Sequence, residues 1–280
     1  MRRGHIVGVA LCLWLAAGLP AHAVLLRYSP KVGDTAKYKV SMAGRTETNV
    51  EGMPEPMRME LSGAIQYTSK ALSETADTVR IETRVTGGKF TAKAAGQSQS
   101  EDVPKGKVVA DMDRRGRMVK TIESDLGGKS GAQDFMTGGA GSWSSFANFA
   151  AFPEGEVKAG DTWSDEMKVP SVEGGPEINL TLASRLLAVA PYQGRNCAKI
   201  RTSFKGPLSF DLPGEAAEGS EMEATLRGDL VWYYDYESSI YVSGEGSVGM
   251  DMKMAMAAPE MSGMQMTTKM LMNIKLALAK

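Results

Sequence analysis

The stretch VGMDMKMAM at residues 248–256 decides the fold class, because apolar and polar side chains alternate along it with a period of two. Every second residue from Val248 to Met256 is apolar, whereas Asp251 and Lys253 lie between them. This period is typical of a β-strand that buries one face and exposes the other. The stretch therefore predicts a half-buried strand lined with methionine.

The same even-numbered register extends outward over most of the C-terminal third. Its other apolar positions are Met222, Ala224, Leu226, Leu230, Trp232, Tyr234, Ile240, Val242, Met264, Met266, Met270, Met272, Ile274, Leu276 and Leu278. Turn residues near 237–239 and 259–260 divide this register, which predicts three successive antiparallel strands. A strand of about 15 residues is roughly 50 Å long, so we expect strong twist and curvature. Gly244 and Gly246 fall on the apolar face, where glycine permits a bend or leaves room for a guest.

Two halves of the chain look related. KVGDT at 31–35 recurs as KAGDT at 158–162, and DRRGRM at 113–118 resembles DYESSI at 235–240, in the same order. This order indicates an internal duplication. We therefore predict an all-β fold of two related antiparallel sheets or half-barrels, both strongly curved. They would comprise residues 24–126 and 153–280.

The segment between the halves, residues 127–152, is predicted to be a Gly-rich linker followed by a short helix. Gly and Ser are frequent from 127 to 142, which is typical of a linker. Aromatic residues at 143, 146, 149 and 152 recur with helical spacing before Pro153. This pattern favours one short amphipathic helix that ends at the proline.

The N-terminus has the pattern of a signal peptide. Arg2 and Arg3 precede an apolar run from residue 6 to 19, and small residues at Ala21 and Ala23 match a signal-peptidase site. We expect cleavage before Val24 and a protein that is periplasmic or secreted, and soluble after export. The apolar run is short for a bilayer span, and no later segment is long and apolar enough for one.

Removal of residues 1–23 restricts the chemistry that remains. It leaves 257 of the 280 residues and, because two arginines are lost, changes the formal net charge from −1 to −3. A near-neutral chain gives no sign of nucleic-acid binding. Both histidines, His5 and His22, leave as well, which excludes Ser-His-Asp triads, Cys-His dyads and His-based zinc sites. We expect no cofactor and no enzymatic activity, and the oligomeric state stays open.

Two motifs carry a resemblance to known proteins. The first is P-x-x-G-D-x-x-x-Y at 30–38, and the second is F-P-x-x-x-V-x-x-G-D-T-W at 152–163. With them, the chain resembles a group of uncharacterised bacterial secreted proteins and lipoproteins that have no established activity. Unlike the lipoprotein members, this chain has no lipobox cysteine. The long predicted sheets are also similar in architecture to the half-barrel lipid carriers of bacterial envelopes, although fold alone does not imply function.

Three functional hypotheses stay open for the exported domain. The first is a curved, Met-lined sheet that binds an apolar, lipid-like ligand or a protein partner, because methionine adapts to variable apolar shapes. Its predicted contact residues are Met250, Met252, Met254, Met256, Met264, Met266, Gly244 and Gly246. The second is Cu(I) binding by clustered thioethers near the turn at 261–266, since these are soft ligands. The third is a structural or assembly subunit.

Other candidate sites have a simpler structural interpretation. Residues 111–116 begin like a calcium-binding loop, but Arg115 occupies a position that needs an oxygen ligand. The aromatic residues at 231–236 alternate, which places Trp232 and Tyr234 in the core. Cys197 lacks a histidine to activate it. The nearby carboxylates that could form an acid/base pair for glycoside hydrolysis are Glu221 and Glu223, or Asp161, Asp165 and Glu166.

Overall fold

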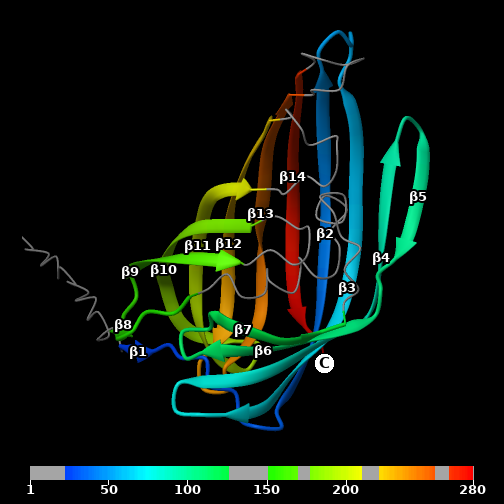
Figure 1. Ribbon diagram of the computed structural model, residues 1–280. Coiled ribbons are helices and arrows are strands. Elements are labelled where there is room, and N and C mark those ends of the chain that lie inside the picture. The colour runs from blue at the N-terminus through cyan, green and yellow to red at the C-terminus, as the bar shows by residue number, and fades with distance from the viewer. Residues whose placement is uncertain (1–22, 126–150, 170–176, 210–220, 256–264, 280) are drawn as a thin grey trace, which may run out of the picture.

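A computed structural model describes residues 23–125, 151–169, 177–209, 221–255 and 265–279. Within these ranges the chain is all-β, as predicted (Figure 1). The strands are β1 (Val24–Leu25), β2 (Thr35–Val50), β3 (Met57–Glu74), β4 (Thr78–Ala94), β5 (Gln97–Asp102), β6 (Gly106–Asp113), β7 (Met118–Ser124), β8 (Glu156–Val157), β9 (Thr162–Val169), β10 (Glu177–Tyr192), β11 (Arg195–Ser209), β12 (Glu221–Asp235), β13 (Ile240–Ala255) and β14 (Gln265–Leu278).

Twelve of the strands form one antiparallel sheet rather than the two sheets that the sequence predicted. Its order is β7-β6-β4-β3-β2-β14-β13-β12-β11-β10-β9, and β5 pairs with the far part of β4. The last strand, β14, pairs with the first long strand, β2, with Leu276 opposite Val40 (Figure 1). This pairing satisfies the backbone groups that would otherwise be open edges of two half-sheets. The separate, strongly curved half-barrels are therefore not found.

The predicted short helix at 143–152 lies mostly outside the described residues. Its last two residues, Ala151 and Phe152, are described and are not helical. No helix occurs in the described ranges, and hence none there is long and apolar enough to cross a membrane. Phe152 is instead an anchor of the core, since it is fully buried and its ring centroid lies 4.5 Å from that of Tyr234.

The two G-D-T stretches form the same turn in both halves. Gly33 has φ 93° and Gly160 has φ 101°, a conformation that glycine adopts without steric cost. In each turn the aspartate carboxylate accepts the backbone N–H of the lysine three residues before it, Lys31 or Lys158. The glycine N–H in each donates to a carbonyl of the next long strand, Ala71 in β3 or Leu186 in β10.

The two hairpins that contain an aspartate are also alike. Asp113 accepts the backbone N–H groups of Arg115 and Arg117, and Asp235 accepts those of Glu237 and Ser238. Each aspartate lies at the end of a strand, β6 or β12, and a short side chain that bonds to the backbone just ahead of it is a common turn former. The matching turns explain why the sequence repeats at these points.

One face of the sheet carries most of the buried apolar side chains, and we call it the apolar face. The even-numbered residues of β12, β13 and β14 point to it, among them Leu226, Met250 and Met272, as the alternation predicted. A second, smaller cluster lies between β4 and β6 and includes Val79 and Met112. Tyr28, in the segment before β2, packs against both clusters.

Side chains link the two ends of the strand order. Arg115, in the turn between β6 and β7, donates from Nε to the carbonyl oxygen of Phe152 at 2.7 Å. Its Nη2 lies 2.9 Å from Oδ2 of Asp165 in β9, an ion pair rather than an aligned hydrogen bond. The backbone N–H of Phe152 donates in turn to the Arg115 carbonyl at 2.8 Å. Residues at opposite edges of the sheet are therefore held together.

Candidate functional site

The predicted methionine site follows the apolar face from its buried centre to a half-exposed end. Met250 and Met252 are buried, with 1% and 5% of their surface exposed, whereas Met254 and Met266 are half-buried. Met256 and Met264 lie outside the described residues. The structure thus places the four described methionines on one face, with their exposure increasing toward the ends of β13 and β14 that are joined by residues 256–264.

The glycines of the predicted site serve close packing. A Cβ atom at Gly244 would lie 2.2 Å from Cε3 of Trp232, its direct partner on β12. At Gly246 a Cβ atom would lie 2.1 Å from the carbonyl oxygen of Asp229. The indole of Trp232 therefore occupies the space that the sequence left open for a guest at Gly244. Phe204 covers Gly228 in the same way, with 2.2 Å to a Cβ atom there.

Three methionines form a row across neighbouring strands at the half-exposed end. Met222 on β12 is directly opposite Met254 on β13, which is directly opposite Met266 on β14. All three are half-buried, and Met222 and Met266 pack against the main core. Direct neighbours in a sheet have Cβ atoms about 4.5–5.5 Å apart, so their thioethers are within reach of one another. We call these three residues the methionine row.

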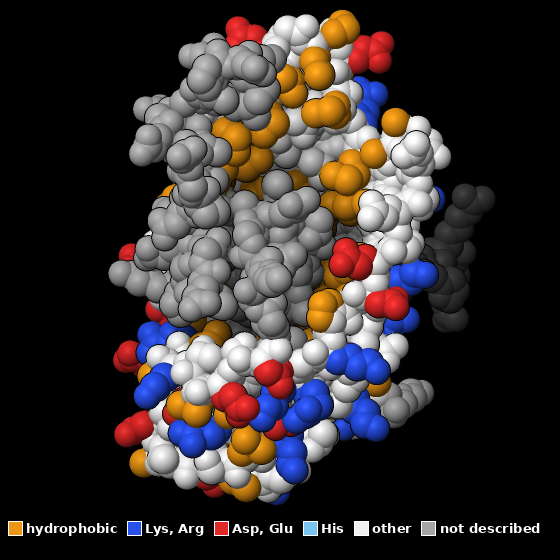
Figure 2. All heavy atoms as spheres, turned by 45° about the vertical axis from the view of Figure 1, so that its right-hand side comes forward, with side chains coloured by type: hydrophobic (Ala, Val, Ile, Leu, Met, Phe, Trp, Pro, Cys, Tyr) orange, Lys and Arg blue, Asp and Glu red, His pale blue; other side chains and the backbone are white. Residues whose placement is uncertain are grey.

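On the face that Figure 2 shows, hydrophobic side chains gather in the upper part and charged side chains crowd the lower part. The apolar face is a single layer among the described strands, because these strands contact mainly their hydrogen-bonded neighbours. A sheet with one apolar face is normally covered by a second layer. The centre of this face is buried, and its exposure increases toward Met254 and Met266.

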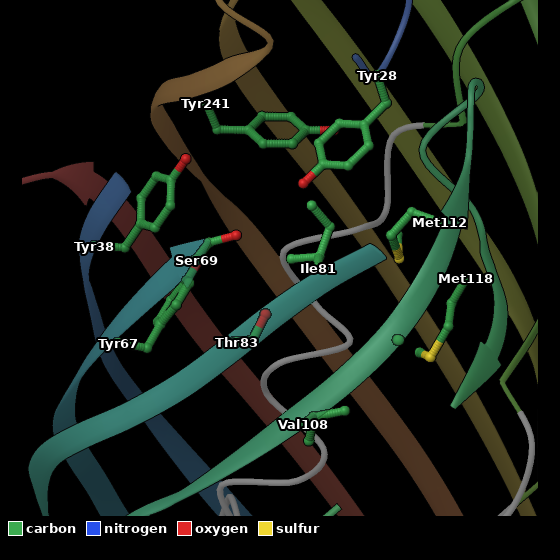
Figure 3. Close-up of a pocket in the computed structure, with 11 residues that line it drawn as sticks. Tyr28, Tyr38, Tyr67, Ser69, Ile81, Thr83, Val108, Met112, Met118 and Tyr241 are labelled. Atoms are coloured by element: carbon green, nitrogen blue, oxygen red, sulfur yellow. The ribbon is translucent and has the colours of Figure 1, made fainter. Parts of the chain in front are cut away.

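A cavity lies at the other end of the apolar face, between the two hydrophobic clusters (Figure 3). It has a volume of about 60 Å³. Strands β2, β3, β4, β6, β7 and β13 and the segment before β2 contribute its lining. The lining residues are Tyr28, Tyr38, Tyr67, Ser69, Ile81, Thr83, Val108, Ala110, Met112, Met118 and Tyr241. We call it the tyrosine cavity.

Local packing fixes the tyrosines of this cavity. The rings of Tyr38 and Tyr67 stack with their centroids 5.0 Å apart on neighbouring strands. Tyr28 is held by its backbone N–H, which donates to the carbonyl of Arg114 at 2.9 Å. Tyr241 contacts Trp232 edge to face at 5.7 Å between ring centroids. Figure 3 shows the hydroxyl groups of Tyr28, Tyr38 and Tyr241 directed into the cluster from different segments.

Burial keeps these tyrosines in their neutral form. Desolvation raises the pKa of Tyr28 to about 12, against the opposing hydrogen bond with Ser69. Burial likewise raises the pKa values of Tyr38, Tyr67 and Tyr241 well above the usual tyrosine range. A neutral phenol both donates and accepts a hydrogen bond. The cavity is therefore lined by uncharged hydroxyl groups that can act in either direction.

The carboxylates considered for acid/base chemistry are separated by the fold. Asp161 belongs to the second G-D-T turn, Asp165 faces Arg115, and Glu166 binds no partner side chain among the described ion pairs. Glu223 is exposed on β12, and the side-chain placement of its neighbour Glu221 lies outside what the structure describes. None of these candidate carboxylates lines the tyrosine cavity or the second cavity, at the Asp235 turn.

At residues 111–116, where the sequence begins like a calcium-binding loop, the carboxylates form ion pairs with arginines instead. Arg80 donates from Nε to Oδ1 of Asp111 at 2.8 Å, and Arg117 donates from Nε to Oδ2 of Asp113 at 2.6 Å. Hydrogen bonding to Arg80 lowers the pKa of Asp111. In the described ranges no group of three or more His, Cys, Asp or Glu side chains is arranged to hold a metal ion.

The aromatic run lies as its alternation predicted. Trp232 and Tyr234 are buried, with 3% and 0% of their surface exposed. Tyr233 points to the opposite face, where its ring stacks on Tyr192 at 3.8 Å between centroids, with Lys199 above it. Cys197 is buried as well, and desolvation raises its pKa to about 11, which leaves little thiolate for nucleophilic attack.

The tyrosine cavity was missed from the sequence, although one signal was present. Tyr38, Tyr67 and Tyr241 are large residues with a polar tip near strand ends, where a buried hydroxyl usually needs a partner. Nothing local indicates that Tyr28 and Tyr241 meet, because more than 200 residues separate them along the chain. No protein-family model matches this sequence, and no curated protein gives a significant match to it.

Proposed function

We propose that this chain is an exported, non-catalytic protein that holds an apolar, lipid-like ligand on the apolar face of its sheet. The supporting observation is that this face runs continuously from buried Met250 to half-buried Met254 and Met266, in a single layer of described strands. Methionine is flexible and polarisable, and therefore suits ligands of variable shape. The signal-peptide pattern at residues 1–23 supports export.

The non-catalytic part of the proposal rests on the side chains available. Residues 24–280 contain no histidine, and Cys197 is buried with a raised pKa. The tyrosine cavity holds no carboxylate, lysine or arginine in its lining, which consists wholly of described residues. Side chains of this kind suit the binding of a ligand better than a chemical reaction on it.

Native mass spectrometry of protein purified from its own envelope tests the main proposal. We expect an additional mass that corresponds to a lipid-like molecule, and a lower melting temperature after its extraction, because a ligand that binds only the folded state stabilises it. A protein without any added mass, whose melting temperature is unchanged by extraction with organic solvent, would contradict the proposal.

A variant pair locates the ligand. The double variant Met254→Gln and Met266→Gln makes the end of the apolar face polar at nearly constant side-chain length. We expect it to weaken binding of the uncharged fluorescent probe N-phenyl-1-naphthylamine roughly tenfold, since two apolar contacts become polar. The matched control is Leu271→Gln, on the same strand but 43% exposed on the opposite face, and it should leave probe binding unchanged.

A second candidate function is Cu(I) binding, and the methionine row is the observation that favours it. Three thioethers from Met222, Met254 and Met266 are direct neighbours in the sheet, and Cu(I) prefers such soft ligands. Titration with Cu(I) under reducing conditions tests this function. Replacing all three residues with leucine should lower the affinity at least tenfold, whereas the control Met118→Leu, outside the row, should not. Equal Cu(I) affinity in both variants would exclude the row as the site.

A further inference from the structure

The tyrosine cavity has the composition of a binding site for an uncharged polar group. Six hydroxyl groups line it, from Tyr28, Tyr38, Tyr67, Tyr241, Ser69 and Thr83. The rest of the lining is apolar, and includes Ile81 and Met112. Without a charged lining residue, the cavity offers no counter-ion to an anion or a cation, and burying an unpaired charge is costly. The chemistry of the lining therefore favours a neutral guest.

Two of the four tyrosine hydroxyl groups are open to a guest. The Tyr28 hydroxyl is hydrogen-bonded with Ser69, and the Tyr38 hydroxyl with the backbone of Tyr241. The hydroxyl groups of Tyr67 and Tyr241 make no hydrogen bond with any other residue that the structure describes. The Tyr67 and Tyr241 side chains are buried, but their hydroxyl oxygens are not fully enclosed and can be reached from the cavity. A guest that both donates and accepts would satisfy this pair.

The volume of the cavity sets the size of this guest. One water molecule needs about 10–15 Å³ of cavity volume, so the cavity of about 60 Å³ has room for a group of roughly four to six non-hydrogen atoms. An aromatic ring is too large, because cavities that bind benzene are closer to about 150 Å³. A hydroxyl group with the one or two carbons that carry it fits this space.

We propose that the tyrosine cavity binds an uncharged hydroxyl-bearing group through Tyr67 and Tyr241. This group comes either from the polar end of the apolar ligand, in which case the inference rests on the proposed function, or from a free small alcohol. The first source is consistent with the strand geometry. Tyr38 and Tyr67 continue along β2 and β3 into the apolar face through Val40, Met42 and Ile65, which share that face.

The test compares three probes on the full-length mature protein. Displacement of N-phenyl-1-naphthylamine measures the binding of 1-dodecanol and of dodecane, which differ only in the hydroxyl group. Saturation-transfer NMR measures the binding of ethylene glycol. The double variant Tyr67→Phe and Tyr241→Phe removes the two open hydroxyls and keeps the rings. Tyr233→Phe, on the opposite face of the sheet, is the matched control, and circular dichroism verifies that each variant is folded.

If the ligand supplies the group, the unmodified protein binds 1-dodecanol roughly tenfold more tightly than dodecane, as expected for a buried hydrogen-bonded hydroxyl. The double variant then binds both equally, and the control behaves like the unmodified protein. If a free alcohol is the guest, ethylene glycol binds and its signal is lost only in the double variant.

Two results separate this inference from the proposed function. Equal binding of 1-dodecanol and dodecane, without any binding of ethylene glycol, overturns the inference and leaves the apolar ligand in place. Binding of ethylene glycol through Tyr67 and Tyr241, with neither long-chain probe bound, overturns the apolar ligand and leaves the inference in place.

Discussion

At the tyrosine end of the apolar face each large side chain has a fixed neighbour, whereas at the methionine end the side chains are flexible and half-buried. Tyr234 packs against Phe152, and its hydroxyl donates to the carbonyl of Arg27 at 2.5 Å. Met254 and Met266 are half-buried, and Met266 packs against the main core. The difference shows that one face can combine a region of tightly packed, hydrogen-bonded side chains with a region of flexible, half-buried ones.

Truncating one side chain to alanine at each end tests this comparison, and the loss of stability at the tyrosine end is the largest effect that we expect. Tyr234→Ala should lower the free energy of unfolding by about 4 kcal/mol, because it removes a fully buried ring and leaves a void. Met254→Ala should cost about 1 kcal/mol, since this side chain is half-buried and its neighbours can adjust. Urea unfolding measures both. Equal losses would mean that the two ends do not differ in rigidity.

Gly244 lies on β13 directly opposite Trp232, and the indole of Trp232 packs against it. Gly244→Ala should destabilise the protein by about 2 kcal/mol, because the new methyl group would lie 2.2 Å from the indole and force it to move. Gly87→Ala is the control, since a Cβ atom there meets nothing within 4 Å. A Gly244→Ala protein as stable as the Gly87→Ala protein would show that Trp232 is not held in place.

The ion pair between Arg115 and Asp165 tests the rigidity of the tyrosine end. Arg115 also donates a hydrogen bond to Phe152, which packs against Tyr234. Arg115→Ala should cost about 2 kcal/mol, since it removes a charged hydrogen bond and leaves Asp165, only 13% exposed, without its closest cation. Arg58→Ala removes a far more exposed pair with Glu47 and should cost less than about 0.5 kcal/mol. Thermal unfolding distinguishes the two variants, and similar melting temperatures would count against a structural link.

The smallest expected effect is a dependence on pH at the Asp235 turn, beside Tyr234. Burial acts to raise the pKa of Asp235, but hydrogen bonds from Arg195 and from backbone N–H groups outweigh it, so the pKa is lowered. A lowered pKa in the folded state contributes stability above the unfolded value of about 3.9, which is lost as the pH falls further. The stability difference between the protein and Asp235→Asn should therefore shrink below about pH 4. A difference that is constant from pH 7 to pH 3 would contradict this.

The sequence predicted what depends on local alternation. The burial of Met250 and Trp232 and the antiparallel order of β12, β13 and β14 follow from a period of two over a long stretch. The role of Gly244 did not follow, because it requires knowledge of the cross-strand partner, Trp232. Whether the space beside a glycine stays empty or is filled depends on the side chain of that partner.

The tyrosine cavity was beyond reach of the sequence for a related reason. Its walls come from six strands and a separate segment, and Tyr28 meets Tyr241 only because the whole sheet is assembled. The single sheet also escaped prediction. Duplicated turns at Gly33 and Gly160 suggested two units, but alternation in β14 and β2 does not state which strand pairs with which.

The pairing of β14 with β2 also sets an order of events during folding. Tyr38 lies opposite Leu278, so β2 pairs with β14, a strand that is synthesised more than 200 residues later. Contacts between such distant segments carry a large loop-closure entropy and make folding slow. Until that contact forms, β2 has an open edge that can pair with another chain. Pairing with β14 therefore protects the edge of β2 from aggregation.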